Sequence, residues 1–139
     1  MKHKFLFGTA LFLVFSSVYA ETPYTEKVKV QTLVSATQDV AGRKIEYPVG
    51  GDPELLELLV EIPVGLSTGW HVHQNPCIAH VLEGLITVED ENGVKRTFKA
   101  GDSFAEVVKL KHCGTNIGTT PVRILLFVAG EKGAPVSNK

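Results

Sequence analysis

Apolar and polar residues alternate in short runs along most of the chain after residue 26. A period of two is typical of a β-strand with one buried face, because successive side chains of a strand point to opposite faces. Turn-forming glycine, proline and asparagine separate the runs. The strands predicted on this basis are residues 27–35, 43–47, 54–62, 78–88, 94–98, 103–108, 111–117 and 122–129. Many short strands with frequent turns predict an all-β sandwich or barrel.

Some of these segments need a decision between alternatives. The leucines and glutamates of 54–62 (ELLELLVEI) favour helix by propensity, but the segment is short and flanked by prolines, so we predict a strand. Glu83-Gly84 interrupts residues 78–88, and the Asn-Gly pair at 92–93 predicts a hairpin turn. The polar residues from 131 onward are expected to form a loose end.

The first twenty residues have the pattern of a secretory signal peptide. Lys2 and Lys4 precede an apolar run at residues 5–15, and Val18-Tyr19-Ala20 is a small-residue cleavage pattern. The run is too short to cross a bilayer of roughly 30 Å as a helix. We therefore expect cleavage after Ala20, a single domain at 21–139 with no membrane association, and a periplasmic or secreted location.

The charge balance argues against nucleic acid as a partner. The chain has 14 lysines and arginines against 15 acidic residues, for a formal net charge of −1. Nucleic-acid binding needs a clustered basic face, and Lys109 and Lys111 are too few to make one. Cys77 and Cys113 are the only cysteines. Export would permit a disulfide between them, but their spacing does not show whether they meet.

His71-Val72-His73 is the most informative short motif. On a strand the two imidazoles would share a face about 6–7 Å apart along the chain, and could bind one metal ion. Two polar residues on a solvated strand face are the alternative for an isolated pair. The spacing of the residues around the pair distinguishes between these two alternatives.

That spacing resembles the two motifs of the cupin family. The first motif is matched by Gly65, five residues, His71-x-His73, three residues, Cys77, six residues and Gly84. The second is matched by Gly101, five residues, Val107, one residue, Lys109, two residues, His112, three residues and Asn116. In the family, glutamate usually holds the place of Cys77, and proline and glycine the places of Val107 and Lys109. The resemblance covers about residues 54–130 and implies an eight-stranded cupin jelly roll, the double-stranded β-helix.

The resemblance also implies a metal centre. His71 and His73 match the motif-one histidines that bind a divalent metal in the family, and His112 matches the motif-two histidine. Three protein ligands leave open positions, as a catalytic or ligand-binding metal requires. Iron is the expected metal if the protein is an enzyme, and zinc, manganese or nickel are alternatives.

Two residues decide what completes this centre. Cys77 is interpreted first as a small buried filler, second as a thiolate ligand that would favour zinc or copper(I), and last as a disulfide partner of Cys113. Glu106 lies six residues before His112, on the same face if the segment stays extended. It is the candidate catalytic residue, as a ligand, a partner of a histidine or a base, with a rim glutamate reaching water as the alternative. Trp70 is expected to face away from the histidines and to serve core or interface packing, and His80 is expected to serve packing or lie at the surface.

Three functions follow from the resemblance. The first is an exported iron-dependent dioxygenase acting on a small organic substrate, like the cysteine, gentisate and diketone dioxygenases. The second is a non-catalytic domain that binds a metal or a small ligand. The third is an isomerase or lyase that uses the metal as a Lewis acid. A homodimer is compatible with a jelly roll that exposes sheet edges.

Overall fold

The computed structural model describes residues 31–48 and 50–139. Residue contacts divide the chain into Met1–Gln31 and Thr32–Lys139, and the fold lies in the second unit. The predicted signal peptide and the first residues of the predicted strand 27–35 lie outside the described residues. The described part contains no helix long and apolar enough to span a membrane.

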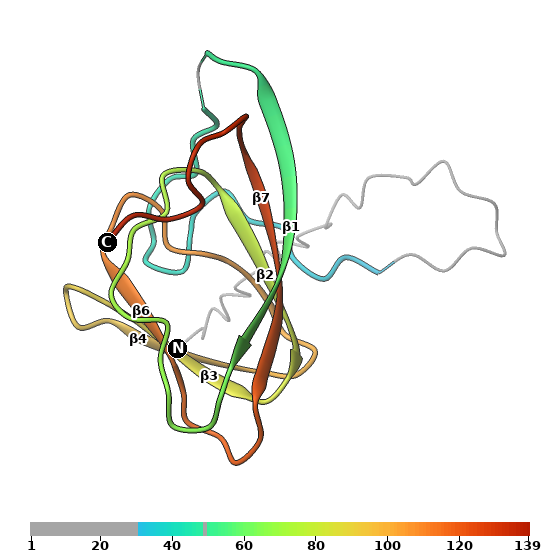
Figure 1. The fold of residues 1–139 in the computed structure, drawn as a ribbon, viewed down its shortest axis with the longest axis vertical. Coiled ribbons are helices and arrows are strands. Elements are labelled where there is room, and N and C mark those ends of the chain that lie inside the picture. Colours follow the sequence, from blue (N-terminus) through green and yellow to red (C-terminus); the bar gives the residue numbers. More distant parts are fainter. Residues whose placement is uncertain (1–30, 49) are drawn as a thin grey trace, which may run out of the picture. The chain divides into compact units, whose positions relative to one another are not determined.

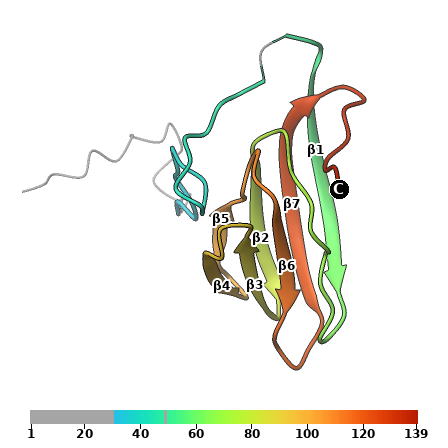
Figure 2. The ribbon, with the colours of Figure 1, turned by 90° about the vertical axis from the view of Figure 1, so that its left-hand side faces the viewer.

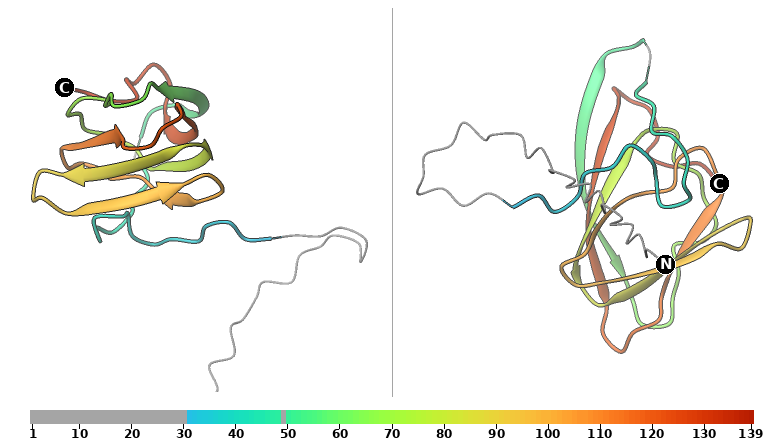
Figure 3. Two further views of the ribbon diagram at one scale, coloured as in Figure 1. Left: turned by 90° about the horizontal axis from the view of Figure 1, so that it is seen from below. Right: turned by 180° about the vertical axis from the view of Figure 1, so that it is seen from behind.

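Within residues 31–48 and 50–139, seven strands form two antiparallel sheets (Figure 1). Their bounds are β1 Pro53–Ile62, β2 Cys77–Glu83, β3 Leu85–Asp90, β4 Lys95–Lys99, β5 Ser103–Ala105, β6 His112–Asn116 and β7 Val122–Glu131. One sheet has the order β1-β7-β2-β5, and Figure 2 shows its strands side by side. The other has the order β4-β3-β6, seen in the left view of Figure 3. The predicted all-β jelly roll is confirmed.

The core lies between the two sheets, where each long strand buries one of its two faces. Along β7 the buried positions alternate strictly, as do those of β2 and β3. On β1 burial alternates as well, with Leu56, Leu58 and Val60 half-buried on the inner face, although Leu55 and Leu59 are exposed on the other. The fully buried side chains of the core include Ala79, Val81, Val107 and Val122.

The interruption predicted at Glu83-Gly84 separates β2 from β3, where the chain passes from one sheet to the other. Gly84 has φ +87°, and a Cβ atom there would lie 2.7 Å from the carbonyl oxygen of Pro121. Glycine is therefore required both by the backbone conformation and by the close approach of the β6–β7 connection.

β5 is shorter than predicted. It ends at Ala105, and the chain then turns through Glu106 to Lys109, whose φ is +55°. The turn is held to the histidine segment by a bond from the Lys109 N–H to the His73 carbonyl (2.7 Å). Glycine usually occupies this position in the resembling motif, and the left-handed conformation of Lys109 explains that preference.

The two earliest strand predictions are wrong where the structure describes them. Residues 31–35 and 43–47 contain no strand, and only an isolated bridge pairs Gln38 with Lys44. The Asp39 side chain accepts hydrogen bonds from the N–H groups of Ala41 and Arg43, which closes a tight loop in place of an extended strand. Alternation predicted strands here, but no long partner strand pairs with them.

The segment after β7 is not loose, contrary to the prediction from its polar composition. The N–H groups of Val72 and Asn138 bond to each other's carbonyls (2.8 and 3.0 Å). Val136 packs against the hydrophobic core. In Figure 1 this dark red segment leaves the end of β7 and crosses toward β6. Its docking therefore brings it to the histidines.

Candidate metal centre

The three predicted histidines come from two paired segments. His71 and His73 lie on an extended stretch between β1 and β2, and His112 begins β6. Reciprocal backbone bonds join His71 to His112, each N–H donating to the other carbonyl at 2.9 Å. His73 pairs with Val108 in the turn after β5. Pairing between segments distant in sequence thus brings the imidazoles together, as the motif spacing predicted.

Each imidazole has its Nδ1 atom against a backbone carbonyl. The acceptors are Gly69 for His71 (2.8 Å), Val136 for His73 (2.8 Å) and Leu110 for His112 (2.9 Å). A carbonyl only accepts, so these contacts assign the proton of each neutral ring to Nδ1. The Nε2 lone pairs are then free. Outer partners that fix the tautomer in this way are typical of histidines that bind metal.

The three Nε2 atoms converge. His71 Nε2 and His73 Nε2 are 3.3 Å apart, and one ligand atom from each histidine lies within 4.8 Å of the others. Two nitrogens each about 2.0–2.1 Å from one ion would be separated by about 3.0–3.4 Å. Two lone pairs facing each other at this distance repel, and a cation between them removes the repulsion. The donor set therefore fits a divalent metal ion.

Burial keeps the histidines in the form that binds metal. His73 and His112 are buried, whereas His71 is half-buried. Burial lowers the pKa of His112 to about 4 and also lowers the pKa of His73, so both rings are neutral at pH 7. His112 Nε2 is buried without a hydrogen-bond partner among the described residues. Such an orphaned acceptor is costly unless a ligand satisfies it.

Glu106 joins the histidines, although not for the predicted reason. The segment does not stay extended, yet the turn after β5 places Glu106 Oε1 3.7 Å from His112 Nε2. The Val107 N–H donates to the same oxygen at 3.2 Å. Burial, and to a smaller extent the charge of Asp39, raises the pKa of Glu106 to about 7. The interpretation of Glu106 as a rim residue in water is wrong, because its side chain is buried.

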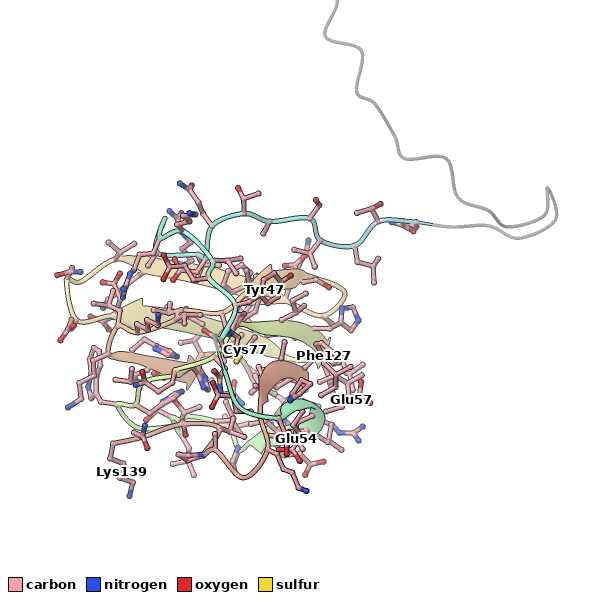
Figure 4. All side chains as sticks on the ribbon, turned by 90° about the horizontal axis from the view of Figure 1, so that it is seen from above. Tyr47, Glu54, Glu57, Cys77, Phe127 and Lys139 are labelled. Atoms are coloured by element: carbon pink, nitrogen blue, oxygen red, sulfur yellow. The ribbon has the colours of Figure 1, made fainter. Side chains whose placement is uncertain are left out.

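Cys77 is a buried filler, the first of its three interpretations. Its thiol donates to the Asn75 carbonyl (3.2 Å), and burial together with the Glu106 charge raises its pKa to about 12. The group of possible metal ligands in the described residues contains the three histidines and not Cys77. Both cysteines are free, so no disulfide joins Cys77 to Cys113. Figure 4 shows Cys77 among the packed side chains.

The histidines lie in a cavity of about 430 Å³ between the sheets. Its walls are mostly aliphatic side chains of both sheets, namely Leu58, Val60, Ile62, Ile86, Val88, Ile124 and Leu126. Trp70 also lines the cavity and is 44% exposed. It was expected to face away, but Gly69 (φ +74°) breaks the regular alternation just before it. His80 bonds to Ser103 Oγ (2.7 Å) and is not among the lining residues.

Two contributors to the site had no sequence signal. Asp39 Oδ2 accepts a hydrogen bond from the Val108 N–H (3.1 Å) and so supports the turn that carries Glu106. The Val136 carbonyl holds His73 from a position 63 residues away in sequence. A buried Asp in an early loop and a backbone carbonyl have no motif of their own, because only tertiary contacts give them a role.

Solved structures with similar folds support this architecture. The chain is 21% identical to a Klebsiella pneumoniae protein with a double-stranded beta-helix domain (TM-score 0.52, covering 64% of this chain and 81% of that one). It is 21% identical to the Cnp3 cupin domain of Schizosaccharomyces pombe (TM-score 0.51, 63% and 64%). It is 22% identical to the DMSP lyase DddQ of Ruegeria pomeroyi (TM-score 0.52, 58% and 41%). At these identities the likeness shows the fold alone.

The chain spans less than half of the DMSP lyase chain that it resembles. No curated protein gives a significant match. The sequence profile of the cupin domain matches residues 58–128, which contain all three histidines and Glu106. The chain therefore belongs to the cupin domain family.

Proposed function

We propose that this protein binds one divalent metal ion through His71, His73 and His112, and acts there on a small organic substrate. One observation carries the proposal: three Nε2 lone pairs, each oriented by a backbone carbonyl, converge in a largely apolar cavity. A purely structural cluster of histidines would pair its nitrogens with donors, whereas His112 Nε2 has no hydrogen-bond partner in the part of the chain that the structure describes.

The cavity indicates the class of substrate. A volume of about 430 Å³ is in the range of sites for small molecules. Aliphatic walls favour an apolar body, and the metal end favours one polar group with oxygen donors. Trp70 adds an aromatic surface at the histidine side of the cavity. The substrate we propose is a small organic molecule with one coordinating polar end.

The chemistry depends on the ion. Bound iron would supply oxygen activation, which gives the dioxygenase as our first proposal, while a redox-inert ion would supply Lewis acidity alone. Glu106 lies 3.7 Å from a ligand nitrogen, where its carboxylate can accept a substrate proton or donate it back. This position favours a metal-dependent isomerase or lyase as the second candidate. Aliphatic walls exclude water in both cases.

The test begins with the metal content of protein purified without added metal, by elemental analysis. About one ion per chain is expected, falling to near zero in His71→Ala and unchanged in His80→Ala, a matched histidine outside the site. Full metal content in the His71 variant would overturn the assignment. Loading with Fe²⁺ and following O₂ consumption with candidate substrates then separates the dioxygenase from the alternatives.

We also propose that the protein is exported. The support is the basic start, apolar run and cleavage pattern of residues 1–20. Mass spectrometry of the protein from its native source should find Glu21 as the first residue. Retention of residues 1–20 on the protein in the cytoplasm would contradict export.

A further inference from the structure

The segment of residues 134–139, which follows β7, contacts the candidate metal centre directly. Pro135 limits its backbone, and Val136 is its one residue that is not exposed. The Val136 carbonyl accepts from His73 Nδ1 at 2.8 Å. Two reciprocal backbone bonds between Val72 and Asn138 fasten the segment beside that histidine. The segment is thus bonded at two consecutive residues, to the backbone of Val72 and to the side chain of His73.

The segment also forms part of the cavity wall. Val136, Ser137 and Lys139 are among the lining residues, and Val136 packs against the core. Figure 4 shows Lys139 at the periphery, pointing outward. The segment therefore contacts His73 at Val136, whereas the side chain of Lys139 points away from the molecule.

We propose that residues 134–139 are a positioning element for the metal ligand His73, so that docking of this segment and metal binding are thermodynamically coupled. The inference rests on the proposed function. With the segment docked, the His73 proton is held at Nδ1 and the Nε2 lone pair faces the other two histidines. With the segment released, Nδ1 loses its acceptor and the ring is free to rotate or change tautomer.

The expected size of the effect follows from outer partners of metal-bound histidines. Loss of such a partner typically weakens metal binding 10–100-fold. Coupling between two events is reciprocal, so the metal must favour docking of the segment by the same factor. If the segment only covered the core, bound metal would slow hydrogen exchange of its amides no more than it slows exchange in the rest of the fold.

The first experiment compares Co²⁺ affinity of the intact chain with that of a variant ending at Gly133, by calorimetry and by the visible Co²⁺ absorption. We expect binding about 10–100-fold weaker in the variant. Val136→Ala keeps the carbonyl but removes the side chain that packs the segment against the core, so it should weaken Co²⁺ binding by a smaller factor than the truncation does. Equal affinity in the intact and shortened chains would overturn the inference.

Two point variants cover the case in which the shortened chain fails to fold. Asn138→Pro removes the N–H that bonds to the Val72 carbonyl, whereas Asn138→Ala keeps both backbone bonds. We expect weaker Co²⁺ binding in the proline variant and unchanged binding in the alanine variant. Equal Co²⁺ affinities in these two folded variants would contradict the coupling.

The reciprocal effect is measured without mutation. Saturating Co²⁺ should slow hydrogen exchange of the Asn138 amide by the factor that the truncation costs in affinity, and more than it slows amides of β4. Unchanged exchange at Asn138 would overturn the inference while the proposed metal site stands. Absence of Co²⁺ binding to the intact chain would instead overturn the proposed function, which distinguishes the two failures.

Discussion

The Glu106 carboxyl group is a buried acid beside three imidazoles, and it should make the metal-free protein less stable at neutral pH. Its pKa is raised to about 7 by burial. Below pH 4.5 both folded and unfolded chains hold the proton, but between pH 4.5 and 7 only the folded chain does. Stability therefore falls as the pH rises through this window. Metal would offset this cost by pairing with the carboxylate charge.

We predict that Glu106→Gln stabilises the metal-free protein at pH 8 by on the order of 2–3 kcal/mol, and not at pH 4. Urea unfolding in the presence of a chelator measures this difference across pH. His112, whose pKa is lowered to about 4, destabilises both proteins below about pH 6.5 and cancels in the comparison. Glu46→Gln, at an exposed position, is the control. A pH-independent difference would show that the pKa of Glu106 is the same in the folded and unfolded chains.

Cys77 should be unreactive in the native protein. A pKa raised to about 12 from 9 reduces the thiolate at pH 8 by about a thousandfold. In a Cys113→Ser background, iodoacetamide should modify Cys77 only after unfolding in urea, as mass spectrometry would show. Cys77→Ala should leave the metal content unchanged. Loss of metal in that variant would restore the thiolate-ligand interpretation.

At the scale of elements, the turn between β5 and β6 both shortens β5 and carries Glu106. Its cost lies at Lys109, in a left-handed conformation that costs a non-glycine residue about 1–2 kcal/mol. The exposed ion pair of Lys109 with Glu46 (3.4 Å) offsets little of this.

We predict that Lys109→Gly raises the free energy of unfolding by about 0.5–1 kcal/mol. Glycine removes the backbone strain, but it also increases the conformational entropy of the unfolded chain, which offsets part of the stabilisation. Lys109→Ala, which keeps the strain and loses the ion pair, should change it little. Urea denaturation of the metal-free proteins measures both. A glycine variant no more stable than the alanine variant would show that the backbone at 109 is not strained.

The same elements show what sequence predicts. β1, β6 and β7 were found within one or two residues, because alternation and flanking prolines or turns mark them locally. Residues 43–47 alternate as well, yet form no strand, since a strand also needs a partner and Asp39 closes a loop there. Local patterns thus predict the capacity to be a strand, whereas pairing decides it.

At the scale of the whole molecule, the site joins three regions that are far apart in sequence. The histidines and Glu106 were predicted, because chemistry restricts which residue types bind metal and the motif spacing is fixed. Asp39 and the Val136 carbonyl were not, because any residue type supplies a carbonyl and only the folded chain brings it to His73. The polar residues after 131 predicted a loose end, although their backbone groups are paired.

The metal would bind His71 and His73, which precede β2, and His112, which begins β6. Because it would link these distant segments, we predict that it stabilises the entire fold. At a free concentration one hundred times the dissociation constant, binding adds about 2.7 kcal/mol to the free energy of unfolding. Removal of metal by a chelator should lower the melting temperature, and Zn²⁺ or Co²⁺ should restore it. His71 is half-buried, so His71→Ala should fold while losing this response, and His80→Ala should keep it. The response should weaken as the pH falls toward 4, where protons compete with the metal for His112, whose pKa is lowered to about 4 by burial. A melting temperature that is insensitive to chelator and metal in the wild-type chain would contradict a shared centre.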